Sequence, residues 1–349
     1  MAQISKKLKY NEPIPKNIKN SGVVRSQNYN DAVEDISNIY NIINNMGGGL
    51  SGANFAVVTA SGTPTENGAE LLAAYDVAKA VAGLTTENRY TIVMAPGTYN
   101  TGTALLVDTE FIDFVSLTGN RDVIFDLGVD PYPTAAGPVP YINVTANDVY
   151  LKGFDSVAKN ATYWGSGTKY HFKVATNLNL LTVENCEGGP YSFGGDFTLV
   201  TPLIISGTYI NCRGGYQAFA GASTASGTFI DCTAYDGQNF GNWGTASGFF
   251  QNCSIGGFNE RGFGSNGIAS GTFIDCIASG RFASSATVSG YILRCKGLFL
   301  CESATITGTV LYSISEQSPI STVSGSGITM YCIGANAPDN QGFVATNKL

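Results

Sequence analysis

A short sequence that returns at a nearly constant interval constrains the fold of this chain more than any other feature. Residues 225–232, ASGTFIDC, recur at residues 269–276, and looser copies occupy residues 205–212, 246–253 and 288–295. Two weaker copies end at Ser313 and Cys332. The central glycines of the seven copies lie 18 to 23 residues apart and are Gly207, Gly227, Gly248, Gly271, Gly290, Gly308 and Gly327. A fixed period of about 20 residues predicts a solenoid.

Each repeat has the composition of β-strands. The second residue after the glycine is mostly aromatic or β-branched, the third is mostly Ile or Leu, and the fifth is Cys in six of the seven copies. Five successive copies also carry a large apolar residue eight positions before the glycine: Phe219, Phe240, Phe263, Phe282 and Leu300. Short segments of this kind, broken by glycine, are typical of strands and turns.

These strands predict a parallel β-helix with two or three strands in each coil. Successive coils would stack about 4.8 Å apart and place like residues in continuous columns. A leucine-rich repeat has a similar period, but its frame of Leu and Asn is absent here.

The composition agrees with a stacked β architecture. Gly accounts for 43 of the 349 residues, and only 13% of residues are charged. Disordered chains combine a high net charge with few apolar residues, so disorder of the body is not expected. The net charge of −7 is unfavourable for nucleic-acid binding. No apolar run is long enough to span a membrane, and no apolar signal-peptide core follows Met1.

The cysteines are expected to be buried free thiols. Six of the eight occupy the repeat column described above, and Cys186 is a candidate earlier member of it. Side chains stacked in one column have parallel Cα–Cβ vectors, which is poor geometry for a disulfide. A buried thiol then packs as a small hydrophobic side chain.

The chain before the repeats divides into two segments. Residues 1–50 contain a basic arm, which we expect to become ordered on a partner, and a heptad-like run, which we expect to form an oligomeric coiled coil. The run consists of Tyr29, Val33, Ile36, Tyr40 and Ile43. A flexible tail and an ordinary amphipathic helix are the alternatives for this segment. Residues 51–102 are expected to hold a strand at 55–58, a helix at 67–83, a strand at 90–94 and a turn at 95–99. The helix would cover the first coil, because an open sheet end invites aggregation.

Residues 103–332 are predicted to form the β-helix. Its first coils are irregular, with strands expected at 104–107, 111–117, 123–127, 141–144 and 149–154, and with loops at 130–140 and 156–169. Residues 333–349 lose the pattern and are expected to form a tail or a cap.

The order of these elements resembles a known family. A helix, a strand followed by Pro96-Gly97-Thr98-Tyr99, and short strands separated by glycine are similar to the right-handed parallel β-helix, or pectin-lyase-like, group. More narrowly, residues 53–332 resemble the body of bacteriophage tail spikes, tail fibres and related appendages. The resemblance implies a right-handed solenoid and a homotrimer whose N-terminal segment binds other virion proteins. It does not imply one activity, because the same fold hosts lyases, hydrolases and inert spacers.

Two features that could carry chemistry are better explained as structural. His171 is the single histidine and lies in a strand-like segment, whereas zinc sites and Ser-His-Asp catalysis need further partners. Residues 262–267 match the pattern GxGxxG, but another repeat follows them where a nucleotide site would have a helix. We therefore expect no metal and no cofactor.

A patch of aromatic and charged residues is the best candidate for a site. Glycoside hydrolysis needs two carboxyl groups about 5 to 10 Å apart. Asp231 and Asp275 share a column but lie two coils apart, with Asn252 on the coil between them. Asp236 and Glu260 fall at nearly the same place on adjacent coils and are the candidate catalytic pair, with solvated turn residues as the alternative reading. Four residues nearby would contact a sugar: Tyr235, Trp243, Phe258 and Arg261.

Three functional hypotheses follow. The first is a virion appendage (a tail spike, tail fibre or head fibre) that is assembled in the host cytoplasm, attaches through residues 1–50 and contacts a host-surface receptor. The alternative is a tail-spike glycanase, a glycoside hydrolase that cleaves host-surface polysaccharide with Asp236 and Glu260. A secreted bacterial adhesin is the third, and the missing signal peptide disfavours it.

The strand pattern also predicts a surface for a homotrimer. Alternate residues of a strand face opposite ways, so if the Cys and Ile columns face the core, the aromatic column of Tyr209, Phe229, Phe250 and Phe273 faces outward. A neighbouring subunit would then cover it. A bend within the strand would instead turn both columns inward.

Overall fold

The computed structural model describes most of the chain from residue 54 onward. The described residues are 54–127, 140–156, 172–189, 192–194, 203–221, 223–235, 237–257, 261–317, 320, 327–330 and 332–334. The predicted attachment segment, residues 1–50, and His171 lie outside them. Of the predicted tail at residues 333–349, only Ile333 and Gly334 are described, and they form a strand paired with the preceding coil.

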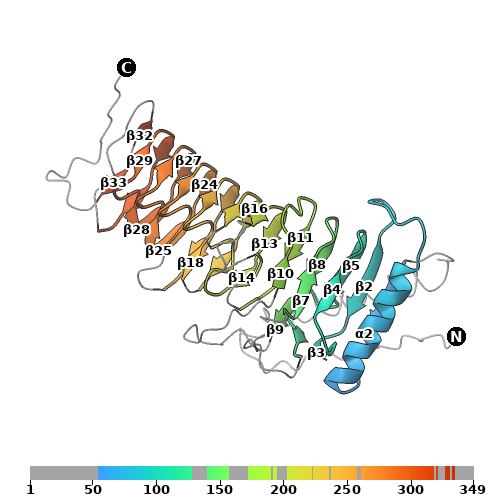
Figure 1. The fold of residues 1–349 in the computed structure, drawn as a ribbon. Coiled ribbons are helices and arrows are strands. Elements are labelled where there is room, and N and C mark those ends of the chain that lie inside the picture. Colours follow the sequence, from blue (N-terminus) through green and yellow to red (C-terminus); the bar gives the residue numbers. More distant parts are fainter. Residues whose placement is uncertain are drawn as a thin grey trace, which may run out of the picture. The chain divides into compact units, whose positions relative to one another are not determined.

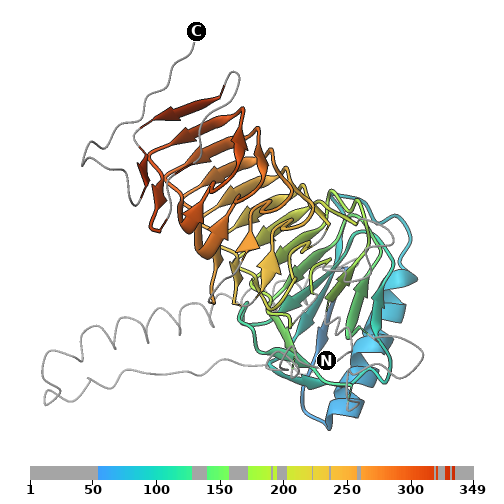
Figure 2. The ribbon, with the colours of Figure 1, turned by 60° about the vertical axis from the view of Figure 1, so that its left-hand side comes forward.

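The described chain winds into a parallel β-helix with coils of about 22 residues (Figures 1 and 2). The strands that form its largest sheet, the main sheet, pair in parallel from one coil to the next. Among the described residues it has 12 strands: β1 (Phe55–Val58), β2 (Tyr90–Met94), β5 (Ile112–Ser116), β8 (Tyr150–Lys152), β11 (Thr182–Glu184), β13 (Thr208–Ile210), β16 (Thr228–Ile230), β20 (Phe249–Gln251), β24 (Thr272–Ile274), β27 (Tyr291–Leu293), β30 (Thr309–Leu311) and β32 (Ile328–Met330).

Shorter strands before and after each main-sheet strand complete the coils. In the first coils they form two three-stranded sheets, β4 (Leu105–Val107), β7 (Ile142–Val144) and β10 (Phe172–Val174), and β3 (Gly97–Tyr99), β6 (Val123–Phe125) and β9 (Phe154–Ser156). In the later coils a six-stranded sheet precedes the main sheet, with β12 (Ile204–Ile205), β15 (Thr224–Ala225), β19 (Thr245–Ala246), β23 (Ile268–Ala269), β26 (Thr287–Val288) and β29 (Thr305–Ile306). A nine-stranded sheet follows it, with β14 (Arg213–Gly214), β17 (Thr233–Ala234), β18 (Gln238–Asn239), β21 (Ser254–Ile255), β22 (Arg261–Gly262), β25 (Ile277–Phe282), β28 (Lys296–Leu300), β31 (Ile314–Ser315) and β33 (Ile333–Gly334).

The helix α2 (Pro64–Lys79) covers the first coil, as predicted (Figure 1). Its Leu71, Tyr75 and Ala78 are buried, and the Tyr75 ring meets Phe114 edge-on at 5.1 Å. It begins earlier than expected, because Thr63 and Glu66 form a capping box at its start, and it also ends earlier, at Lys79.

Most predicted strands are present with slightly different bounds, and two expectations were wrong. The predicted turn at 95–99 contains β3, and the predicted strand at 149–154 is two strands, β8 and β9, separated at Gly153. Gly153 has a φ of 83°, a left-handed conformation that side chains disfavour and that ends β8.

In the later coils, a corner after each strand of the main sheet determines which columns face the core. Asn211, Asp231, Asn252 and Asp275 occupy this corner with φ between 48° and 55°. Asn and Asp adopt this left-handed conformation more readily than other side chains do. Because the corner reverses the alternation, the residues two before it and one after it both point inward.

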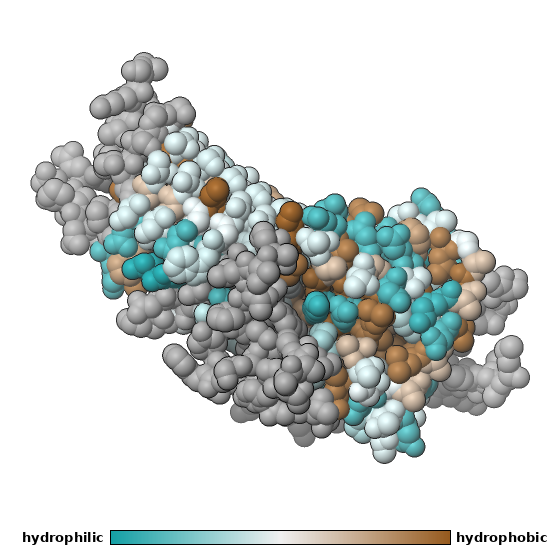
Figure 3. Space-filling view, in the orientation of Figure 1, coloured by the Kyte–Doolittle hydropathy of each residue, from teal (hydrophilic) through white to brown (hydrophobic). Residues whose placement is uncertain are grey.

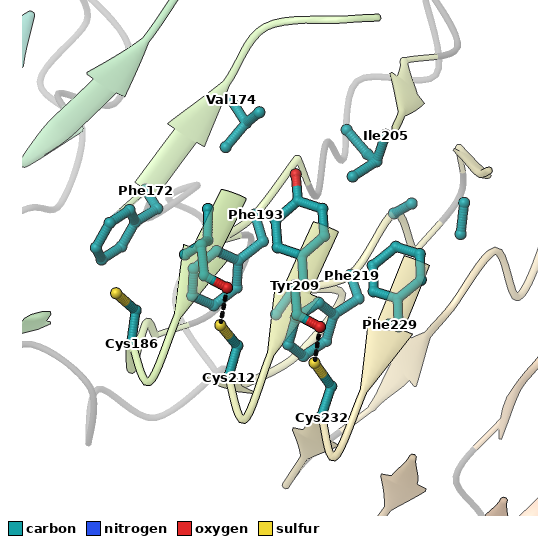
Figure 4. Close-up of a cluster of buried hydrophobic side chains, with 14 of the residues drawn as sticks. Phe172, Val174, Cys186, Phe193, Ile205, Tyr209, Cys212, Phe219, Phe229 and Cys232 are labelled. Carbon is teal, nitrogen blue, oxygen red and sulfur yellow. Dashed lines mark hydrogen bonds between the residues drawn. The ribbon is translucent and has the colours of Figure 1, made fainter. Parts of the chain in front are cut away.

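Of the two alternatives, the bend is the one observed, and the expectation of an outward-facing aromatic column was wrong. Tyr209, Phe229, Phe250 and Phe273 are fully buried, and neighbouring rings stack 4.9 to 5.1 Å apart. A second buried column stacks beside them and meets them edge-on (Figure 4): Phe193, Phe219, Phe240, Phe263 and Phe282. Two interlocking aromatic columns thus fill the core of the later coils.

The cysteines form the ladder that the repeat predicts. All eight are free, and Figure 4 shows Cys186, Cys212 and Cys232 in one row. Seven of the thiols, all except Cys301, lie against a backbone carbonyl of the preceding coil, as where Cys232 Sγ donates to the Tyr209 carbonyl at 3.3 Å. Burial raises the pKa of the Cys212 and Cys232 thiols well above its ordinary value, so both remain protonated.

The Ile column lies on the outer face of the main sheet, contrary to the expectation that it faces the core. Ile210, Ile230, Ile274, Leu293 and Leu311 are half-buried there.

Figure 3 shows one face of the molecule, on which the later coils are mainly pale with single strongly hydrophobic residues among them. Within the described residues, no helix is long and apolar enough to cross a membrane.

Candidate functional site

The predicted sugar-facing patch is partly described. Tyr235, Trp243 and Arg261 lie within the described residues, whereas Asp236, Phe258 and Glu260 lie outside them. The roles proposed for Asp236 and Glu260 therefore remain predictions.

Trp243 presents its ring at the surface from the turn between β18 and β19. The residue is 51% exposed, and the Arg261 guanidinium lies 5.8 Å from the centre of its ring. The buried Asn242 holds the indole. With its amide oriented to satisfy both neighbours, it accepts a hydrogen bond from Trp243 Nε1 at 2.8 Å and donates to the Ser265 carbonyl at 3.1 Å. The ring is thus fixed in place with much of its surface accessible.

Tyr235 is anchored through its hydroxyl. It is 39% exposed, and its hydroxyl donates to the Gly188 carbonyl at 3.1 Å, two coils nearer the N-terminus. Its ring can therefore contribute apolar contact area, while its polar end is engaged with the backbone.

Strand register extends the patch to residues that the sequence analysis missed. Arg261 in β22 pairs with Arg281 in β25, and Arg281 pairs with Phe299 in β28. The Arg281 guanidinium lies 5.8 Å from the centre of the Phe299 ring. We name Trp243, Arg261, Arg281 and Phe299 the arginine patch. Arg281 lies 20 residues after Arg261, close to one repeat, so the period of the glycines could have revealed the pair.

The carboxylates of the corner column have structural partners. Asn252 Nδ2 donates to Asp231 Oδ1 at 2.6 Å, and Arg294 binds both oxygens of Asp275 at 2.7 Å. The hydrogen bonds from Arg294 lower the pKa of Asp275, so this carboxyl is a poor general acid. The register confirms that Asp231 and Asp275 lie two coils apart.

A second polar cluster lies near the N-terminal end of the main sheet. Arg89 binds both oxygens of Asp113 at 2.7 Å and reaches Asp148 at 2.6 Å. Beside it, Lys152 pairs with Glu184 at 2.8 Å, and the Tyr150 hydroxyl donates to Glu184. Hydrogen bonding to Asp113 raises the pKa of Arg89, and burial raises the pKa of Tyr150. The sequence analysis missed this cluster, whose matched charges link neighbouring coils.

The other predicted features fit a structural role. Residues 262–267 form the end of β22 and the turn before β23, which supports the reading of GxGxxG as repeat turn chemistry. The described part of the chain contains no group of three or more His, Cys, Asp or Glu residues arranged to hold a metal ion.

Stacked parallel coils around one apolar core define the chain as a parallel β-helix solenoid. No protein-family model, curated protein or solved structure matches it.

Proposed function

We propose that this chain is a structural appendage of a bacteriophage virion, a homotrimer that contacts the host surface through its β-helical body. Residues 1–50 would attach it to other virion proteins. The proposal rests on the resemblance described above and on one feature of the body, an apolar stripe on an outer face.

The stripe that carries the proposal is the aliphatic column of the main sheet. Ile210, Ile230, Ile274, Leu293 and Leu311 face outward on successive strands, interrupted only by Gln251. Between Ile210 and Leu311 it spans five coil spacings, or roughly 24 Å at about 4.8 Å each. A largely apolar stripe of this length favours burial against a neighbouring molecule. In a homotrimer with a rotation axis, each of the three copies would present the same stripe and could cover the stripe of a neighbouring copy.

Light scattering on the purified full chain tests the assembly. We expect a mass three times the 36.6 kDa of one chain. Lysines introduced together by Ile230→Lys and Ile274→Lys should yield monomers, because charges buried at the interface would lack partners. Ile277→Lys is the matched control, since Ile277 is 48% exposed on the nine-stranded sheet. A monomeric mass for the unmodified chain would refute the trimer.

Particle attachment and host contact need separate tests. A chain lacking residues 1–50 should fail to join particles, and an excess of the free full chain should block particle adsorption to host cells. Adsorption that is insensitive to the free chain would contradict a receptor-binding role.

The glycanase hypothesis predicts that the chain releases new reducing ends from host polysaccharide and that the Glu260→Gln variant releases none.

A further inference from the structure

The arginine patch differs from the other charged ladders of the solenoid. In three ladders elsewhere in the described residues, a basic side chain pairs with an acid on a neighbouring coil. Lys152 pairs with Glu184, Arg294 with Asp275, and Lys296 with Glu316, at 2.7 to 2.8 Å. Arg261 and Arg281 instead stand in register with one another, and within the described chain neither forms an ion pair. Like charges directly opposite each other on neighbouring strands are destabilising.

Aromatic rings hold both guanidinium groups at the surface. Arg261 lies over Trp243 and Arg281 over Phe299, each 5.8 Å from the ring centre. Burial alternates along β25, so that Arg281 faces outward while Phe282 fills the core. The two strands are neighbours, so the backbones that carry the arginines are about 4.8 Å apart. Both guanidinium groups can therefore reach the oxygens of one carboxylate or phosphate.

We propose that the arginine patch binds an anionic group of a glycan, with Arg261 and Arg281 on the oxyanion and Trp243 against the sugar ring. An oxyanion placed there would offset the repulsion between the two cations, which no carboxylate of the described chain does. The inference rests on the proposed host-surface binding and specifies its ligand class as acidic. A single-stranded nucleic acid is the competing ligand, and the net charge of −7 favours the glycan.

Affinity electrophoresis of the full chain at low ionic strength tests this inference. The probes are polygalacturonate, the same polymer after reduction of its carboxyl groups, a glycerol-phosphate teichoic acid and a single-stranded oligonucleotide. We expect polygalacturonate or teichoic acid to retard the chain more than the reduced polymer does, and their comparison separates carboxylate from phosphate recognition. Loss of one charge-assisted contact in Arg261→Gln or Arg281→Gln should weaken binding about tenfold or more.

Arg213→Gln is the matched control, because it removes the same charge from an exposed residue of the same sheet, two coils away. This variant should retain the binding of the unmodified chain, and all variants should keep its circular dichroism. Equal binding of the charged and reduced polymers, no binding of either anionic glycan, or unchanged binding in both arginine variants would overturn the inference. Preferential, arginine-dependent binding of the oligonucleotide would also overturn it. None of these outcomes bears on the trimer or on particle attachment, whose failure the earlier experiments would detect separately.

Discussion

Substitution of Gly248 by Ala should destabilise the solenoid strongly. A Cβ atom at this position would lie 2.0 Å from the carbonyl oxygen of Gly227, the equivalent residue of the preceding coil. The next glycines of the column, Gly271, Gly290 and Gly308, are equally confined, with a backbone oxygen 2.1 to 2.2 Å away. The obstacle is backbone, so no side-chain rotation can relieve it.

The loss of stability follows from the backbone displacement that a Cβ atom at residue 248 would force. Separating the two coils would stretch the hydrogen bonds from Phe249 N to Gly227 O and from Gly248 N to Ala225 O, both 3.0 Å long. Overpacking costs about 1 to 3 kcal/mol, and each backbone hydrogen bond contributes about 1 kcal/mol net. We therefore expect Gly248→Ala to lower the free energy of unfolding by about 3 to 5 kcal/mol.

Urea unfolding followed by circular dichroism measures this effect, with Gly256→Ala as the control. The nearest atom to a Cβ at Gly256 is 3.8 Å away, and its φ is not left-handed. Its substitution should change the free energy of unfolding by less than about 1 kcal/mol, in either direction. Equal stabilities of the two variants would refute the argument that coil spacing excludes a side chain from the glycine column.

Three further changes test the core. Phe250→Ala should lower the free energy of unfolding, measured with urea, by about 3 to 5 kcal/mol, because Phe250 is fully buried and contacts four aromatic rings. A loss below about 1 kcal/mol would contradict the stacked core. Tyr209→Phe should stabilise the protein by about 1 kcal/mol, since the buried Tyr209 hydroxyl has no hydrogen-bond partner among the described residues, and a lower urea midpoint would be inconsistent with this reading. Burial raises the pKa of Tyr99 from 10.0 to about 12, so its contribution to stability is complete below pH 10 and is lost as the pH rises towards 12. The urea midpoint should fall over that range more steeply for the unmodified chain than for Tyr99→Phe, and parallel pH profiles would disprove a role for Tyr99.

Much of the fold could be predicted from local patterns. The interval between the glycines identifies the coil, and the Cys column identifies its register, because residues that recur with the coil must stack. The helix α2 could also be placed from its apolar face, and Thr63 and Glu66 contain the signal for its true start.

The candidate site was less accessible to such reasoning. Trp243 and Arg261 were recognised as neighbours because their loops fall at nearly the same place on adjacent coils. Arg281 and Phe299 follow at intervals of about one repeat, but a register shift within β25 separates the pairing of Ala278 from that of Arg281, so strand pairing was needed to place them in the patch. The length of each coil therefore decides which distant side chains share a column.

The sequence by itself determined that the chain forms stacked coils with continuous columns, since the repeat is visible residue by residue. Only the tertiary structure decided which columns fill the core and which face outward. The reason is the left-handed corner at residues such as Asp231, where one backbone dihedral angle reverses the side-chain alternation and buries Phe229 together with Cys232. It thereby leaves Ile230 on the surface, where the proposed subunit contact lies.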